Sequence, residues 1–197
     1  DISFESNILM NDNIKERFME LIHNQLNISI KLSRIYSAIN HGFRSRNLYS
    51  KCKNECPTII LVKNEYDTIF GGYTSIPRTN TLAYNRQNRG YRIDKSAFLY
   101  QLHPNIRVFL NKNANGKYAV NHHPSYLTIF GVGRDLKVYS NSDNDARSYA
   151  FPSTFDMKSG NELIGGKQVN SKLNTKYYFK VIDVELFEVN QDTQQQI

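Results

Sequence analysis

The sequence predicts an α+β fold that is mainly β: a two-sheet antiparallel β-sandwich flanked by short helices. About eight to ten short apolar segments are separated by turn signals rich in Asn, Gly and Pro. Both helical patterns lie in the first third of the chain, so strands and helices do not alternate as they do in a doubly wound sheet. Residues 176–189 are apolar on both faces, which is typical of a central strand packed on two sides.

Two helices and an intervening strand are expected in the first third of the chain. Residues 12–26 place apolar side chains at helical spacing and charged ones opposite, and Asn residues just before them suit a helix N-cap. A strand at 31–38 has one face made by Leu32, Tyr36 and Ala38. After a sharp turn at Gly42, a short helix capped by Ser45 points its apolar residues inward, namely Leu48, Tyr49 and Cys52.

The rest of the chain is expected to form strands and loops. Pro57 ends the second helix, and residues 58–63 and 66–74 form a β-hairpin. Residues 76–95, rich in Arg, Asn and Thr, are expected to form a long basic loop. A second loop is expected at 156–175, and further strands at 97–102, 106–110, 118–120, 126–130, 136–139 and 176–189.

The length of 197 residues favours one domain at 11–190, with an N-terminal arm at 1–10 and a polar tail at 191–197. No apolar run approaches the roughly 20 residues of a membrane span. No signal peptide follows Asp1, so we expect a cytoplasmic protein, with the nucleus as the alternative, and a fragment of a longer chain. The oligomeric state is not predicted.

The cysteines and histidines do not indicate a metal or cofactor site. Cys52 and Cys56 lie four residues apart near a helix end and are interpreted as reduced thiols. His122 and His123 could in principle complete a zinc site, but adjacent residues on a strand point to opposite faces. We therefore expect neither a metal nor a cofactor.

The net charge is +7, and its distribution suggests a binding surface. No acid occurs from residue 27 to residue 54, and a second basic group at 78–95 is opposed only by Asp94. Such clusters attract phosphate backbones, anionic lipids or acidic protein faces, although a solvated face would look the same. The candidate binding residues are Arg44, Arg46, Arg78, Arg86, Arg89 and Arg92.

The sequence contains only weak indications of a catalytic site. The chain has no G-x-S-x-G elbow and no phosphate-binding P-loop, and the G-x-G at 131–133 lies between strands. His41 could act as a general base beside a Ser or Asp. Asp183 and Glu185 share a strand face and could form a paired-carboxylate site. We favour a structural Glu185, partly buried and hydrogen-bonded to backbone or to an arginine.

The order of short motifs is more specific than any single motif. From about Ser6 to Val189 it resembles the TLDc domain family of the oxidation-resistance type, including protist members with FGGYT. The motifs are His41-Gly42-Phe43, Leu48-Tyr49-Ser50-Lys51-Cys52, Pro57-Thr58, Phe70-Gly71-Gly72-Tyr73, Phe98-Leu99-Tyr100, Phe130-Gly131-Val132-Gly133, Asp135-Leu136, Ser148-Tyr149 and Glu185-Leu186-Phe187-Glu188-Val189. The chain departs from the family where Arg44 replaces a usual Ser, where Pro77 and Arg78 replace a usual Trp, and at Val132.

The resemblance implies a β-sandwich of two antiparallel sheets, protection against oxidative stress, and in several members binding to the vacuolar proton-pumping ATPase. No accepted catalytic site accompanies the family, so a non-catalytic protein-interaction domain is expected. The alternatives are a nucleic-acid-binding regulator of stress-responsive transcription and an unrecognised hydrolase. The first would stack bases on Tyr36, Phe43, Tyr49, Tyr84 and Tyr91. Residues of the family signature with a structural role are His41, Gly42, Gly71, Gly72, Gly131, Gly133 and Glu185.

Overall fold

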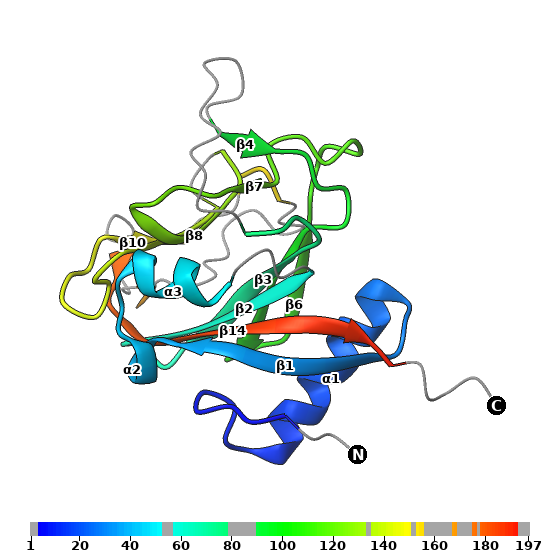
Figure 1. Ribbon diagram of the computed structural model, residues 1–197, viewed down its shortest axis with the longest axis horizontal. Helices are drawn as coiled ribbons and strands as arrows, with labels where there is room; N and C mark the ends of the chain where they lie inside the picture. The colour runs from blue at the N-terminus through cyan, green and yellow to red at the C-terminus, as the bar shows by residue number, and fades with distance from the viewer. Residues whose placement is uncertain are drawn as a thin grey trace.

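A computed structural model describes residues 4–52, 57–78, 90–132, 135–150, 153–155, 167–168, 175–176 and 178–192. Within these residues, two six-stranded antiparallel sheets face each other, and β11 (Lys167–Gln168) pairs with β12 (Thr175–Lys176). The arrangement of the two sheets in Figure 1 confirms the predicted sandwich.

The first sheet contains the longest strand, which lies second from one edge. In spatial order its strands are β1 (Ile30–Ser37), β14 (Val181–Gln191), β2 (Thr58–Asn64), β3 (Ile69–Thr74), β5 (Phe98–His103) and β6 (Arg107–Leu110). Both faces of β14 are buried along most of its length, as its two apolar faces predicted. β2 and β3 form the expected hairpin.

The second sheet is built from shorter strands. In spatial order these are β13 (Tyr178–Phe179), β10 (Ser148–Tyr149), β9 (Leu136–Tyr139), β8 (Tyr126–Phe130), β7 (Val120–Asn121) and β4 (Tyr91–Arg92). β4 lies within the segment that was predicted to be a loop. It forms because Arg92 pairs with Val120 of β7, a partner distant in the sequence.

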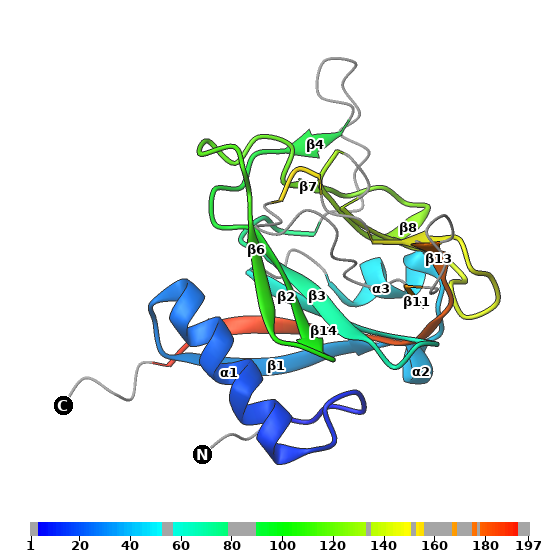
Figure 2. The ribbon, with the colours of Figure 1, turned by 180° about the vertical axis from the view of Figure 1, so that it is seen from behind.

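Helix α1 (Asp12–Leu26) confirms the predicted first helix. The Asn11 side chain accepts a hydrogen bond from the backbone N–H of Asn13 at 2.9 Å and caps the helix. Asn27 ends it in the left-handed conformation, with φ of 54°. Figure 2 shows α1 lying across the outer face of the first sheet. Two short helices, α2 (Ala38–His41) and α3 (Ser45–Lys51), follow β1.

Two cores hold these layers together. An inter-sheet core contains Phe70, Leu99, Phe130 and Leu186, among others. A helix-side core lies between the first sheet and α1, and it also includes Phe4, Ile8 and Leu9 from the segment before α1. Burial of apolar side chains on both faces of the first sheet stabilises the fold at about 25 cal/mol per Å². No helix in the described part of the chain is long and apolar enough to cross a membrane.

Two strands differ from the prediction because of irregular pairing. Leu32 and Tyr36 were expected on one face, but Leu32 packs in the helix-side core and Tyr36 in the inter-sheet core. The pairing of β1 with β14 shifts between Arg34 and Tyr36, and a bulge of this kind reverses the faces. The predicted strand 176–189 is likewise interrupted, since Lys180 separates β13 from β14.

A third correction concerns the cap of α3. Ser45 was expected at the N-cap position, but Arg44 occupies it and Ser45 is the first helical residue. The Ser45 hydroxyl instead donates a hydrogen bond to the carbonyl of Pro124, and its backbone N–H donates to the Ser140 hydroxyl at 3.1 Å. These contacts attach α3 to the second sheet.

Candidate functional site

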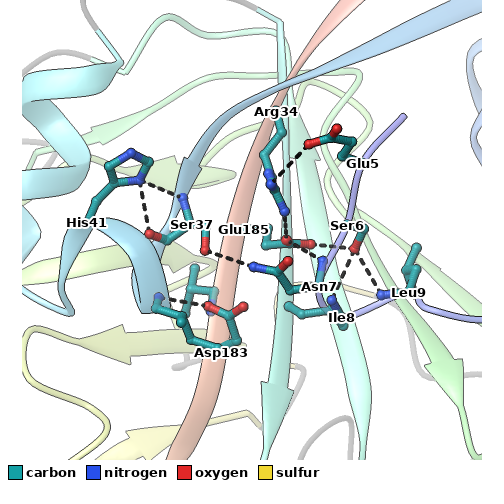
Figure 3. A network of polar contacts seen from close by, with 12 residues as sticks. Glu5, Ser6, Asn7, Ile8, Leu9, Arg34, Ser37, His41, Asp183 and Glu185 are labelled. Atoms are coloured by element: carbon teal, nitrogen blue, oxygen red, sulfur yellow. Dashed lines mark hydrogen bonds and ion pairs between the residues drawn. The ribbon is translucent and has the colours of Figure 1, made fainter. Parts of the chain in front are cut away.

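Glu185 lies at the centre of a polar network on the α1 side of the first sheet (Figure 3). Its carboxylate is fully buried and accepts hydrogen bonds from the Ser6 hydroxyl at 2.5 Å and the Asn7 backbone N–H at 2.8 Å. The Arg34 guanidinium donates to it at 2.7 Å and also lies 3.6 Å from Glu5. Hydrogen bonds to the backbone and to an arginine are the contacts that we predicted from the sequence for Glu185. They attach the segment before α1 to β1 and β14.

Asp183 lies two residues before Glu185 on the same strand. Its Oδ1 atom accepts hydrogen bonds from the backbone N–H groups of Ile39 at 3.2 Å and Val184 at 2.8 Å. Its Oδ2 atom is buried and has no partner among the described residues. Burial raises the pKa of Asp183 to about 6; the hydrogen bond from Ile39 opposes the shift, and the charge of Glu185 adds to it.

The two carboxylates do not form the arrangement that paired-carboxylate hydrolysis requires. A glycosidase needs both carboxyl groups to face a substrate, one as acid and the other as base or nucleophile. Glu185 is instead occupied by three donors, and both side chains are buried beneath the N-terminal segment and α2. This geometry supports a structural role for the pair.

His41 ends α2 and contacts the backbone. Its Nδ1 atom lies 3.0 Å from the carbonyl oxygen and 3.1 Å from the backbone nitrogen of Ser37 (Figure 3). Its ring stacks on Tyr36, with centroids 5.6 Å apart. Among the described residues no Ser, Cys or carboxylate side chain is hydrogen-bonded to His41. The contacts of His41 therefore provide no nucleophile–base pair for the hydrolase alternative.

The two glycines of the FGGY segment lie where side chains would collide. A Cβ atom on Gly71 would lie 1.8 Å from the Ile60 carbonyl oxygen, and one on Gly72 would lie 2.8 Å from the Phe130 ring. Both positions therefore serve close packing between strands and between sheets. Gly42 and Gly131 have φ angles of 86° and 72°, and Gly133 lies outside the described residues.

Arg44 and Arg46 are exposed at the start of α3 and have no ion pair with any described acid. Arg92 is half-buried in β4, in a separate part of the molecule. Arg86, Arg89 and Cys56 lie outside the described residues. Cys52 is buried and carries a thiol, and no group of three metal-binding side chains occurs in the described ranges.

Arg78 requires a correction, because it was expected at a binding surface. Its side chain is only 2% exposed. The guanidinium donates to the hydroxyl of Thr58 at 3.2 Å and to the hydroxyl of Thr128 at 3.4 Å, while its Nη2 atom has no partner among the described residues. Arg78 therefore lies between the sheets and cannot contact a partner in this conformation. Its burial lowers its own pKa.

His122 is a second buried polar group near Arg78. Both ring nitrogens lack partners among the described residues. Burial, followed by the positive charges of Arg78 and Arg92, lowers the pKa of His122 to about 3. The imidazole is therefore neutral at physiological pH. Two aromatic residues on which the nucleic-acid alternative relies, Tyr36 and Tyr49, are also buried and cannot stack on bases.

Sequence reasoning missed several residues that the structure brings together. Ser6, Asn7 and Arg34 were not linked to Glu185, and Lys112 and Lys117 were not linked to Lys95. The absence of any acid except Asp94 between residues 90 and 132 is a signal that could have grouped these lysines. The contacts of Glu185 join positions more than 150 residues apart and leave no local pattern.

The fold and these sites can be compared with known proteins. The sequence model of one protein family, the TLDc domain, matches residues 3–190 of the chain. The chain is also similar to "MTOR-associated protein MEAK7" of Danio rerio, with 32% identity over 84 residues. That match covers 43% of this chain and 17% of the relative. The chain thus matches a small part of a much longer protein, whereas the domain match covers nearly all of the described residues.

Proposed function

The chain belongs to the TLDc domain family, and on this basis we propose that it is a non-catalytic protein-interaction domain. The observation that carries the proposal is the domain match over residues 3–190. The name of the zebrafish relative, which describes association with another protein, is consistent with it. The side chains of His41 and Glu185 already contact the Ser37 backbone and Arg34, respectively, and this also favours a non-catalytic role.

The finer proposal is that the domain binds the vacuolar proton-pumping ATPase and acts in protection against oxidative stress, as the family resemblance implies. Arg44 and Arg46 are the best-placed residues for a partner contact. They are exposed, lie two residues apart and form no ion pair with a described acid. Exposed charges at an interface accelerate association and select an oppositely charged partner. We include Arg86, Arg89 and Arg92 as a second contact region.

A pull-down from the source cell tests this proposal. The bait is wild-type protein, an Arg44→Glu/Arg46→Glu variant, an Arg86/Arg89/Arg92 charge-reversal variant, or an Arg17→Glu/Lys31→Glu control. The control reverses the same number of exposed charges as the first variant, but on α1 and β1. We expect wild type and the control to retain ATPase subunits and the two test variants to lose them. Failure of wild type to retain any subunit would reject the ATPase as partner, and retention by both test variants would reject the arginine contacts.

A further inference from the structure

Four chain segments meet at the end of the molecule that carries β4. The Asp94 N–H donates to the Gly116 carbonyl at 3.0 Å, and the Ala119 N–H donates to the Arg92 carbonyl at 3.2 Å. The Tyr91 hydroxyl donates to the Gly131 carbonyl at 3.2 Å. The Val132 N–H donates to the hydroxyl of Thr154, and the Lys112 N–H donates to the carbonyl of Thr154. We call three of these segments, the described residues 91–96, 110–118 and 131–132, the β4 end, and it lies far from α1 in both ribbon views (Figures 1 and 2).

The β4 end presents positive charge to solvent. Lys95, Lys112 and Lys117 are exposed, and none of them forms an ion pair with a described acid. Lys117 lies over the ring of Tyr118, with Nζ 4.7 Å from its centroid. Arg92 adds a fourth cation, half-buried in β4. The contact of Gly116 with the backbone of Asp94 and Lys95 holds the two lysine-bearing turns side by side.

The two acids near the β4 end are turned inward. Asp94 is buried and accepts hydrogen bonds from the hydroxyls of Thr74, Ser75 and Ser96 and from two backbone N–H groups. Asp135 is fully buried and accepts from the N–H groups of residues 153–155. Neutral donors therefore hold both carboxylates inside the fold, and the Oδ2 atom of Asp135 has no partner among the described residues. Among the described residues of this end, the exposed charged side chains are Lys95, Lys112 and Lys117, and none of these three lysines forms an ion pair with a described acid.

Exposed aliphatic side chains lie among these cations. Ile93 is 62% exposed between Arg92 and Asp94, Leu110 is 54% exposed beside the 111–117 turn, and Val132 is 46% exposed next to Thr154. Single exposed apolar residues are common, but three on linked segments of one cationic end form an amphipathic surface. The aromatic rings here, Tyr91 and Tyr118, pack edge-on against each other and are half-buried.

We propose that the β4 end docks on the surface of a bilayer containing anionic phospholipid. Lysines attract the negative headgroups, and exposed aliphatic side chains enter the headgroup boundary. A single-stranded nucleic acid would stack its bases on exposed aromatic rings, which Tyr91 and Tyr118 do not provide, and a duplex would use the cations but leave the exposed aliphatic side chains without a role. An acidic protein would use the cations but would not require Ile93 to project. This proposal goes beyond the protein-interaction role and does not depend on it.

Vesicle co-sedimentation tests the proposal with the intact chain. The vesicles are phosphatidylcholine alone, or phosphatidylcholine with about one-quarter phosphatidylserine, at about 50 mM salt. The variants are Lys95→Gln/Lys117→Gln and Ile93→Ser. Their matched controls are Lys31→Gln/Lys180→Gln, which removes the same charge from β1 and from the residue between β13 and β14, and Ile182→Ser, at another exposed isoleucine.

We expect wild type to bind only the anionic vesicles. The lysine variant should weaken this binding about 25-fold, at roughly fivefold per lysine. Ile93→Ser should also weaken it, whereas both controls should bind as wild type does. Absence of wild-type binding to anionic vesicles would overturn the proposal, as would equal losses in test and control variants. Binding that depends on the lysines but is unchanged in Ile93→Ser would show electrostatic adsorption alone and would overturn the part of the proposal in which the aliphatic side chains enter the headgroup boundary.

Discussion

The Arg34 guanidinium lies 2.7 Å from Oε1 of Glu185 and joins β1 to β14 on the helix-covered face of the first sheet. Glu185 is fully buried, whereas the Arg34 side chain keeps 19% of its surface exposed. Ser6 and Asn7 complete the coordination of the carboxylate. One buried charge therefore holds three separate parts of the chain together, including the segment that leads into α1.

Replacing Glu185 with Gln should destabilise the fold. The variant leaves the partly buried Arg34 cation with only the exposed Glu5 carboxylate, 3.6 Å away, as a counter-ion, and breaking a buried pair costs about 3 kcal/mol. Urea unfolding followed by circular dichroism measures the free energy of unfolding. Glu188→Gln, three residues along β14 and half-buried, serves as the control and should cost much less. A loss below about 1 kcal/mol for Glu185→Gln would contradict the role assigned to this pair.

Asp183 should make the fold less stable as pH rises. Its pKa is raised from 3.8 to about 6, so the folded state binds its proton more tightly than the unfolded state does. The free energy of unfolding should therefore fall by about 2 kcal/mol from about pH 4 to about pH 7 on account of this residue. The Asp183→Asn variant lacks this titration. Its stability relative to wild type should rise over the same pH range, and a constant difference would contradict the assignment.

His122 should make the fold less stable as pH falls, which is the opposite of the effect of Asp183. Its pKa is lowered from 6.5 to about 3, so its contribution is complete above about pH 6.5 and is lost as pH falls toward 3. We expect it to remove about 3 kcal/mol of stability between about pH 6.5 and pH 4. The His122→Leu variant should lose less stability over this range than wild type. Parallel pH profiles for the two proteins would show that His122 also titrates normally when folded.

The two adjacent glycines should respond differently to Ala. At Gly71 the new Cβ atom would meet a backbone carbonyl oxygen, which cannot move without distorting β2. At Gly72 it would meet side-chain atoms of Phe130 and Leu99, which can shift. We expect Gly71→Ala to cost at least about 3 kcal/mol and Gly72→Ala about 1 to 2 kcal/mol. Thermal unfolding of both variants measures this order, and equal costs would contradict it.

Local patterns were sufficient to predict the elements of the fold. The helix at 12–26 and the hairpin of β2 and β3 follow from apolar periodicity and turn residues, which act over a few positions. The faces of β1 were not predictable, since the bulge near Ile35 depends on how β1 pairs with β14, some 150 residues away. A shift of one residue reverses every side chain beyond it.

The basic residues show the same limit at the level of the site. The sequence identified a cationic chain and grouped Arg78 with Arg92 and Lys95. It could not show that Arg78 turns into the inter-sheet core while Lys95 turns outward, because solvent exposure depends on contacts with other strands. Nor could it show that Asp94, apparently the counter-charge, is satisfied by hydroxyl and backbone donors.

By itself, the sequence determined the β-rich sandwich, the first helix and the family, because these depend on periodicity and on the order of motifs along the chain. Only the tertiary structure decided which charges are buried and which face solvent. The free energy of a charged group depends on its dielectric surroundings and partners, and these come from distant segments. Glu185 and Arg78 therefore belong to the interior, whereas Arg44, Arg46 and the lysines of the β4 end remain on the surface.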